Sequence, residues 1–462
     1  MDITPKLAGE LDDKLAHDLK PDKRLGLPKR YLAGDHDLAY MPTKAKPEYR
    51  QIAERSIDNW LPLIPDEFTK GLAVDGFRAP RASDNVEAWR YWQDNGLDAR
   101  QTIAHRGAFE YGTSYVLVLP GVDKSRPQIK PLSPLRSAAW YADDDDDYPE
   151  LGLIRLDTFR EGQQKRQRVA ILDDTRVVYY SRPVEGGDMR YERTLLHGLG
   201  VTPLVRFRDR LDGEALGLVR PFKRHQDRIN AIAFNIAMAM QYATFRQRWA
   251  TGLAIPEDDD GNPVEPFNAA IDRLWISDDP NARFGDFAQT DIRGMQDEYK
   301  AAVASLAAAA QISPAILTGD LVNVSADALL AIRTGTNRKL DEYKLLFGES
   351  WELVLRLAAA AAGATPPPTD AETMWRDTSG DSFAAKVDGL GKLAQMLAVP
   401  QEALWEEVPG MTDSKLQRWR ELAKPDALDS LTAEIMRQGA AAEATLGAAQ
   451  PPAPAPTEPL QA

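Results

Sequence analysis

Five consecutive aspartates, Asp143 to Asp147, are the densest group of potential metal ligands in this sequence of 462 residues. Hard divalent cations bind carboxylate oxygens, so the run could hold a metal ion that activates water in a metal-dependent nuclease. A bare run does not fix the directions of its side chains, and its like charges repel one another. We therefore interpret it as a solvated loop between two strands and expect no metal site, with the nuclease kept as the alternative function.

Other residues that could catalyse a reaction or bind a cofactor form no recognisable group. The five histidines are scattered, and there is no cysteine for a disulfide or a thiolate metal site. Residues 389–392, Gly-Leu-Gly-Lys, lack the spacing and the hydroxyl residue of a phosphate-binding loop. No zinc-protease helix, nucleophile elbow or dinucleotide fingerprint occurs either. We expect a protein that is not an enzyme and needs no cofactor, and the absence of cysteine suits folding in a reducing cytoplasm.

The charge of the chain limits what it can bind. The 70 acidic residues outnumber the 56 basic ones, which gives a formal net charge of -14. Such a surface does not hold the phosphates of nucleic acid tightly unless basic residues are locally segregated. Any contact with DNA is therefore expected to be local or weak.

Basic residues are segregated in residues 218–250. Apolar residues recur there at spacings of three and four, which predicts a long amphipathic helix. Six basic residues against Asp227 alone give this helix a net charge of +5. The six are Arg220, Lys223, Arg224, Arg228, Arg246 and Arg248. The simplest interpretation from the residues alone is a solvated basic face near an acidic segment.

The following segment, residues 251–290, has the opposite charge. It contains four prolines, a β-like run at 273–277, and nine acidic residues against two basic ones, a net charge of -7. We expect a protruding acidic knob between two helices. Asp258 and Asp260 are spaced as in a calcium loop, but Pro256 stands where the first ligand belongs, so we predict no calcium site.

The pattern in residues 1–217 predicts an α+β body. Helices are expected at 11–33, at 48–61 and at 85–112. Pro62 and Pro65 should end the second of these, and Asn95-Gly96 favours a break in the third. Strands are expected at 113–119, 128–132, 138–142, 152–159, 168–172 and 176–181. A spacing of about ten residues favours an antiparallel sheet or meander.

The C-terminal half is predicted to be mainly helical. Helices are expected at 291–311 and 325–362, with Gly335 and Gly348 favouring a bend in the longer one. Shorter helices are expected at 381–397, 401–408 and 413–423. The Ala/Pro-rich sequence from about residue 439 is expected to be disordered. The uncharged stretch 229–245 is short for a membrane span and contains Asn and Gln, so we predict a packed helix, with a membrane pore as a further alternative.

Four sequence motifs carry a family resemblance. They are AHRGAFEYGTSYVLV at 104–118, GVTPLVRFRDR at 200–210, GLVRPFKRHQDRIN at 217–230 and ISPAILTGDLVNVSADALL at 312–330. Their order and spacing resemble the portal proteins of tailed double-stranded DNA bacteriophages, of the type common in phages of actinobacteria.

The resemblance implies a mainly helical α+β fold and a division of the chain. The implied parts are an α/β wing (1–217), two stem helices (218–250 and 291–311), a small clip with short strands (251–290), a channel loop (312–325), a long kinked helix with a linker (326–369), a helical crown (370–440) and a disordered tail (441–462). In that family about twelve subunits form a ring at one capsid vertex, and DNA passes through its channel. The chain would then belong to the virion, and to the host cytoplasm during assembly.

The resemblance also implies roles for particular residues. The channel loop would touch DNA weakly through Thr318, Gly319, Asp320, Leu321, Val322, Asn323 and Val324. The six basic stem residues would face either DNA or a neighbouring subunit. The clip would contact the terminase large subunit and later a head-completion adaptor through Glu257, Asp258, Asp259, Asp260, Trp275, Asp278 and Asp279. The major capsid protein and scaffold would be further partners, the terminase would hydrolyse ATP, and no membrane would be involved.

Overall fold

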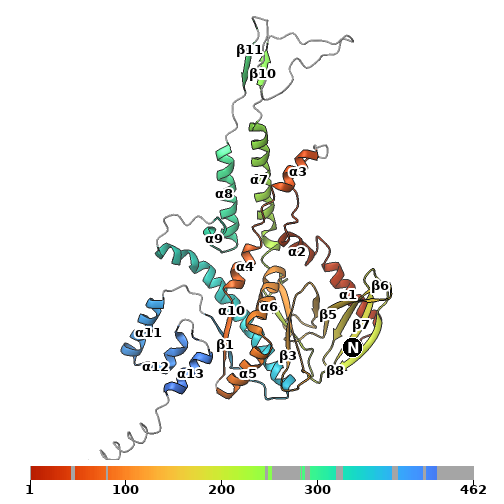
Figure 1. The fold of residues 1–462 in the computed structure, drawn as a ribbon, viewed down its shortest axis with the longest axis vertical. Coiled ribbons are helices and arrows are strands. Elements are labelled where there is room, and N and C mark those ends of the chain that lie inside the picture. The colour runs from red at the N-terminus through yellow and green to blue at the C-terminus, as the bar shows by residue number, and fades with distance from the viewer. Residues whose placement is uncertain are drawn as a thin grey trace, which may run out of the picture. The chain divides into compact units, whose positions relative to one another are not determined.

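The computed structural model shows a mixed α and β fold in two compact units, Met1–Ser379 and Gly380–Ala462 (Figure 1). The structure describes residues 2–42, 47–79, 82–244, 248–251, 281, 283–286, 292–318, 326–376, 383–408, 411 and 413–423. Each unit is described separately below.

Four short helices begin the chain. They are α1 (Pro5–Asp18), α2 (Gly26–Leu32), α3 (Pro47–Arg55) and α4 (Leu63–Lys70). Thr4 caps α1 by accepting a hydrogen bond from the N–H of Leu7 at 3.2 Å. The prediction that Pro62 and Pro65 end a helix was wrong. Helix α3 ends at Arg55, and the two prolines lie at the start of α4, where the first N–H groups need no helical partner.

The next helical segment is broken where the sequence predicted it. Helix α5 (Ala82–Asp94) and helix α6 (Leu97–Tyr111) are separated by Asn95 and Gly96. Gly96 has a φ of 59°, the left-handed conformation that glycine adopts at little cost. Asn95 joins the break to a neighbouring strand, because its Oδ1 accepts from the N–H of Ile129 at 2.9 Å.

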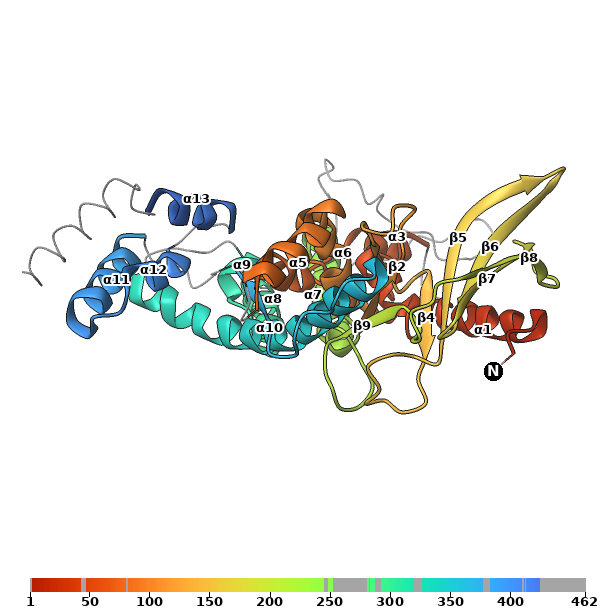
Figure 2. The same ribbon diagram turned by 90° about the horizontal axis from the view of Figure 1, so that it is seen from below.

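The body contains two antiparallel sheets. The smaller has the order β3-β2-β9 and the larger the order β4-β5-β6-β7-β8. The strands are β2 (Thr113–Leu119), β3 (Gln128–Leu132), β4 (Ser137–Trp140), β5 (Leu151–Glu161), β6 (Gln164–Leu172), β7 (Arg176–Pro183), β8 (Arg190–Leu196) and β9 (Leu204–Arg208). The six strands predicted between residues 113 and 181 are confirmed, and the larger sheet is the expected meander (Figure 2).

Helix α1 covers one face of the larger sheet. Leu11 and Leu15 of α1 are buried with Leu153 and Ile171 of β5 and β6. The other face packs on the smaller sheet. Strand β2 is buried on both of its faces, which explains its continuous apolar run: alternate residues of a strand point to opposite sides.

Helix α10 (Ala326–Ala362) is one uninterrupted helix of 37 residues that crosses the body. It is curved but unbroken (Figure 2), and Gly335 and Gly348 both lie within it. Its second half lies in the largest core cluster, where Phe347 and Trp351 have no exposed surface. The predicted helix at 325–362 is therefore confirmed.

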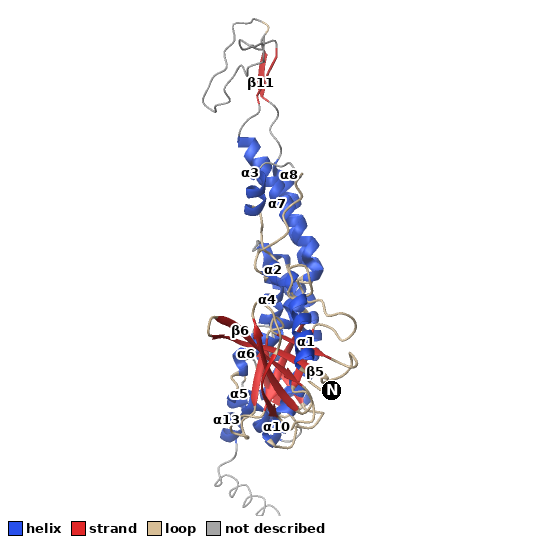
Figure 3. Cartoon of the chain, turned by 90° about the vertical axis from the view of Figure 1, so that its right-hand side faces the viewer, coloured by secondary structure: helices blue, strands red, loops and turns tan. Residues whose placement is uncertain are grey.

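Helix α7 (Lys223–Thr244) and helix α8 (Ile292–Ala309) lie side by side as a hairpin (Figures 1 and 3). The 3-10 turn η1 (Arg220–Phe222) precedes α7. The predicted helix at 218–250 was too long. Residues 248–251 form strand β10 (Arg248–Thr251), which pairs antiparallel with β11 (Arg283–Asp286). That partner lies further along the chain, so local apolar spacing could not reveal the pairing.

The last strand of the first unit pairs with the first strand of the chain. The described part of the second unit is helical. Strand β12 (Glu372–Trp375) pairs with β1 (Val74–Arg78), although residues 370–440 were expected to form the crown. The second unit contains α11 (Phe383–Leu397), α12 (Gln401–Leu404), the 3-10 turn η2 (Trp405–Glu407) and α13 (Asp413–Ala423). These match the short helices predicted there. The predicted disordered tail lies outside the described residues.

Candidate functional site

The α7–α8 hairpin leaves much of its apolar surface only half covered. At its base Ile229 of α7 and Leu306 of α8 are fully buried. Further along α7, Ile232 and Ile236 of the predicted apolar stripe are half-buried, and Met240 is 54% exposed. A surface helix normally turns such a stripe toward a core. One chain alone therefore does not provide a full core for this hairpin.

The basic residues of the hairpin are largely neutralised within the chain. The Nζ of Lys223 lies 2.6 Å from carboxylates of both Asp37 and Asp227. Arg220 pairs with Glu214 at 2.7 Å, and Arg228 of α7 pairs with Glu298 of α8 at 2.6 Å.

Arg224 of α7 and Lys300 of α8 are exceptions: both are exposed and make no ion pair with any residue that the structure describes. Arg246 lies outside the described residues, and Arg248 is described only in its backbone, within β10. The net charge of +5 was counted along the helix alone. It therefore left out the acidic residues of other elements that pair with these basic residues.

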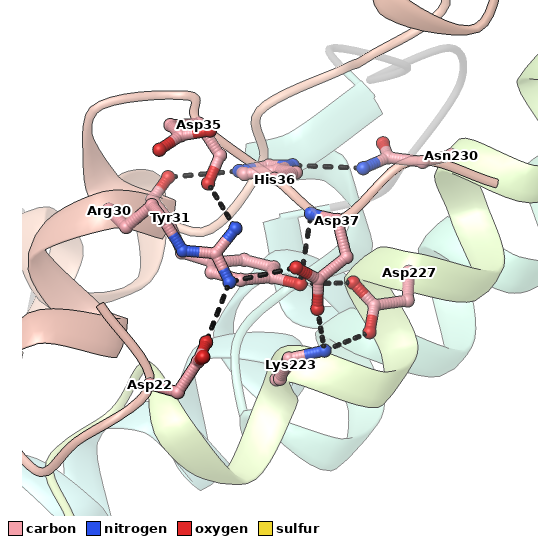
Figure 4. Close-up of polar contacts among 9 residues, drawn as sticks. All are labelled: Asp22, Arg30, Tyr31, Asp35, His36, Asp37, Lys223, Asp227 and Asn230. Atoms are coloured by element: carbon pink, nitrogen blue, oxygen red, sulfur yellow. Dashed lines mark hydrogen bonds and ion pairs between the residues drawn. The ribbon is translucent and has the colours of Figure 1, made fainter. Parts of the chain in front are cut away.

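A polar network fastens the base of α7 to the N-terminal segment (Figure 4). We call it the anchor; its members are Tyr31, His36, Asp37, Lys223, Asp227 and Asn230. The hydroxyl of Tyr31 donates to Asp227 at 2.6 Å, and Lys223 bridges Asp227 and Asp37. Burial by itself would lower the pKa of Lys223, but its bonds to Asp227 and Asp37 raise it above the usual value. Lys223 is therefore held charged between two carboxylates.

His36 is the buried centre of the anchor. Its Nε2 lies 2.9 Å from the carbonyl oxygen of Tyr31, which can only accept, so Nε2 carries the proton. Nδ1 then accepts from the side-chain amide of Asn230 at 2.9 Å. The oxygen of that amide is already bound, since it accepts from Gln226 at 2.9 Å and from the N–H of Asp58 at 3.2 Å. The network therefore holds His36 neutral, and burial lowers its pKa.

The anchor should make stability depend on pH. Because the pKa of His36 is lowered from its ordinary 6.5, the folded chain binds fewer protons than the unfolded chain. The stability that neutral His36 provides is fully present above about pH 6.5 and is lost as the pH falls through the lowered pKa. In denaturant titrations, the free energy of unfolding should therefore fall more steeply below about pH 6.5 in the wild type than in His36→Gln.

Comparing the wild type with His36→Gln separates the contribution of His36 to the pH dependence from that of other titrating groups. Burial lowers the pKa of His105 to about 3, which gives a slope of the same sign, and raises the pKa of Glu110 to about 7, which gives the opposite sign. Both groups are present in the wild type and the variant. The charges nearest His36, Asp227 and Arg30, are also unchanged. Parallel pH profiles would contradict a neutral, doubly bonded His36.

Helix α8 is tied to the same region by a second set of bonds. The hydroxyl of Tyr299 donates to the carboxylate of Asp58 and accepts from the indole N–H of Trp60, the latter at 3.2 Å. The N–H of Trp60 in turn donates to Gln226 of α7 at 3.0 Å. Both helices of the hairpin are thus fixed at their base by residues 58–60. The sequence analysis missed these contacts because it placed residues 58–60 in a helix predicted at 48–61, whereas α3 ends at Arg55.

Three of the four sequence motifs meet where the body leads into α7. Gly112, with a φ of 88°, ends α6, and an added Cβ would lie 2.6 Å from the backbone of residue 215. An added Cβ at Gly217 would lie 2.8 Å from the N of Gly112. The N–H of Leu218 donates to the carbonyl of Phe109 at 2.6 Å, and Asp209 accepts from the N–H of Gly217 at 3.1 Å. The glycines allow two backbones to touch at this junction.

The remaining predicted site residues are not brought together. Asp143 to Asp147 are exposed, and Asp144 pairs with Arg206 at 3.2 Å. No three carboxylate or histidine side chains among the described residues are placed to hold a metal ion. Thr318 ends α9 (Pro314–Thr318). Residues 319–324 and the clip residues Glu257, Asp258, Asp259, Asp260, Trp275, Asp278 and Asp279 lie outside the described part of the chain.

In the ranges that the structure describes, no helix has the length and apolar composition of a membrane span. The stretch at 229–245, the one weighed as a membrane segment, begins with the buried Ile229 and Asn230 of α7. The described features form a body that holds a helical hairpin at its base.

Comparison with known proteins gives the family. Residues 11–427 match the family model described as phage portal protein, SPP1 Gp6-like, so the chain belongs to the phage portal protein family. The portal proteins of Mycobacterium phages L5 and D29 are each 25% identical to it, over 351 and 354 residues, with 72% of this chain and 71% of each relative covered. This is a family of structural proteins of the bacteriophage virion, at the connection of head and tail.

Two solved structures are similar to the chain at low identity. One is a chain from the neck of an empty gene transfer agent particle, with a TM-score of 0.45 and 11% identity over 82% of this chain and 90% of that one. The other is a chain from the native gene transfer agent virion, with a TM-score of 0.40 and 11% identity over 80% of this chain and 95% of that one.

Proposed function

We propose that copies of this chain form a ring, of about twelve subunits, at one vertex of a phage capsid, and that double-stranded DNA passes through the ring during packaging and ejection. Membership of the portal family over residues 11–427 carries the proposal. In this assignment the α7–α8 hairpin is the stem and β10–β11 belongs to the clip. The clip is the docking site for the packaging terminase and then for a head-completion adaptor.

The half-covered surface of the hairpin supports the ring. A ring of identical subunits needs one surface of each copy to fit a different surface of the next. Helix α7 carries small residues among its apolar positions, at Ala231, Ala233, Ala237 and Ala239, so a neighbouring helix can approach closely. Covering half-buried apolar surface is favourable at about 25 cal/mol per Å². We therefore assign the faces of the hairpin that one chain leaves half covered to neighbouring copies.

The paired charges of the stem suit a channel that passes DNA without holding it. Each phosphate that a cation neutralises adds affinity and would slow sliding. Lys223, Arg220 and Arg228 already have carboxylate partners, so they attract phosphate weakly. The alternative of a metal-dependent nuclease has no support, because the Asp143 to Asp147 run makes no metal-binding group among the described residues.

Cysteine cross-linking tests the assignment of the stem surface. The chain has no cysteine, so Met240→Cys introduces a single reactive thiol on the exposed part of the stem. With a short bis-maleimide, Met240→Cys should give covalent dimers in high yield, because the same residue recurs on the neighbouring stem and each thiol can be linked to only one other thiol. Val122→Cys, a fully exposed position on the loop between β2 and β3, is the matched control. Equal yields of covalent dimer in both variants would contradict stem packing.

A further inference from the structure

A pocket of about 590 Å³ lies between α10 and the corner that joins α8 to α9. Its polar lining consists of Gln311 and Ser313 from the corner and Arg338, Lys339 and Glu342 from α10. The other lining residues are apolar or glycine. Ile312, Ser313 and Pro314 lie in the segment expected to be the channel loop, but the residues that α10 contributes to the pocket have been given no role so far.

The corner that forms one wall has a strained backbone, which specific hydrogen bonds hold in place. Gln311 has a φ of 58°, a left-handed conformation that costs a residue other than glycine about 1–3 kcal/mol. The hydroxyl of Thr336, a buried residue of α10, donates to the carbonyl of Gln311 at 2.9 Å. The N–H of Ile312 closes the end of α8 by bonding to the carbonyl of Ala307 at 3.0 Å. The wall is therefore preformed and fixed to α10.

The charges of the pocket leave one cation available. Lys339 pairs with Glu342 at 2.8 Å and lies over the ring of Tyr343 at 4.9 Å. Arg338 is exposed and has no ion pair with any residue in the described ranges. The amide of Gln311 and the hydroxyl of Ser313 add neutral hydrogen-bond donors. The pocket thus offers mainly donors and a net positive charge in a chain of net charge -14.

We propose that this pocket binds a phosphate of the double-stranded DNA backbone, with Arg338 as the principal contact. The proposal rests on the proposed function, which brings DNA into the ring. A guanidinium matches a phosphate with two parallel hydrogen bonds, whereas the paired Lys339 can contribute little. The corner also leads through α9 to Thr318, where the segment expected to touch DNA begins. One available cation in each subunit gives a contact that is weak and independent of base sequence.

The test measures binding of a short DNA duplex to the assembled protein by fluorescence anisotropy. Arg338→Gln should weaken binding by at least about three- to tenfold and reduce the slope of log affinity against log salt by about one for each subunit that contacts the duplex, between about 50 and 200 mM salt. Glu342→Gln should have the opposite effect, because it releases Lys339 and so tightens binding by a few-fold. Arg100→Gln is the matched control: it removes an exposed cation of α6 that also has no ion pair with any described residue, and it should leave the affinity nearer that of the wild type.

The outcomes separate this proposal from the proposed function. If Arg338→Gln forms wild-type rings and binds DNA with unchanged affinity and salt slope, the phosphate site is overturned and the portal ring stands. If it prevents ring formation but leaves DNA binding intact, the pocket holds a carboxylate of a second copy instead, which also overturns the phosphate site. If the wild type neither forms rings nor binds the duplex, both proposals fail. Opposite shifts for Arg338→Gln and Glu342→Gln in proteins that form rings support the phosphate site.

Discussion

Replacing Trp351 with alanine is expected to lower the free energy of unfolding by about 3–5 kcal/mol. Trp351 of α10 is fully buried, with its ring centroid 4.8 Å from that of Trp92 and 4.9 Å from that of Phe207. Its indole N–H donates to Nε2 of His105 at 2.9 Å. The substitution therefore leaves a large cavity and, in addition, a buried acceptor without its donor.

Denaturant titration of purified protein measures this loss. Trp351→Phe keeps most of the packed volume but not the donor, so it should cost clearly less than alanine. Trp89→Ala is a suitable control, because Trp89 is half-buried and stacks on the outer side of the same cluster at 5.6 Å from Trp92. A loss for Trp351→Ala no larger than that for Trp89→Ala would show that α10 does not anchor the core as described.

Replacing Asp12 with alanine is expected to cost about 3–5 kcal/mol of stability. Asp12 of α1 is 1% exposed and lies 2.5 Å from both Arg155 of β5 and Arg182 of β7. Removing it leaves two largely buried guanidinium groups without their shared carboxylate. An uncompensated buried charge is much more costly than the loss of an exposed ion pair.

The neighbouring residue provides a matched control for Asp12. Asp13 also pairs with Arg182, at 2.7 Å, but its side chain is 71% exposed. Asp13→Ala should therefore change the free energy of unfolding by no more than about 1 kcal/mol. Thermal or denaturant unfolding of both variants gives the comparison. Similar losses at the two positions would mean that Asp12 does not hold α1 on the sheet.

Much of the fold could be predicted from local patterns. Residues 292–309 and 413–423 carry regular apolar spacing, and the structure has helices α8 and α13 there. Residues 113–119 form an apolar, β-branched run after Gly112, and they form β2. In each case the signal and the element lie within the same few residues, so the sequence contains all that is needed.

Pairings between distant segments could not be predicted in this way. Strand β1 has its partner β12 nearly three hundred residues later, and β8 is so exposed that it carries no apolar alternation. The bond from Asp12 to Arg155 likewise joins segments with no shared periodicity. Such contacts are properties of the folded topology rather than of local sequence.

The candidate site was predicted in part. The basic residues of α7 were found from their segregation, but their partners Asp37, Glu214 and Glu298 lie on other elements. A count of charge along one helix therefore overestimated its free charge. His36 gave no signal, since its role depends on Tyr31 and Asn230 reaching it from two elements. The roles of the channel loop and of the clip stay predictions.

The central claim is that this chain assembles into a ring with a channel, and electron microscopy of the purified protein tests it most directly. Two-dimensional class averages should show closed rings of about twelve units around a central hole, with the hairpins of neighbouring subunits side by side. A single population of isolated subunits at high protein concentration, under conditions where the chain is folded, would contradict the claim.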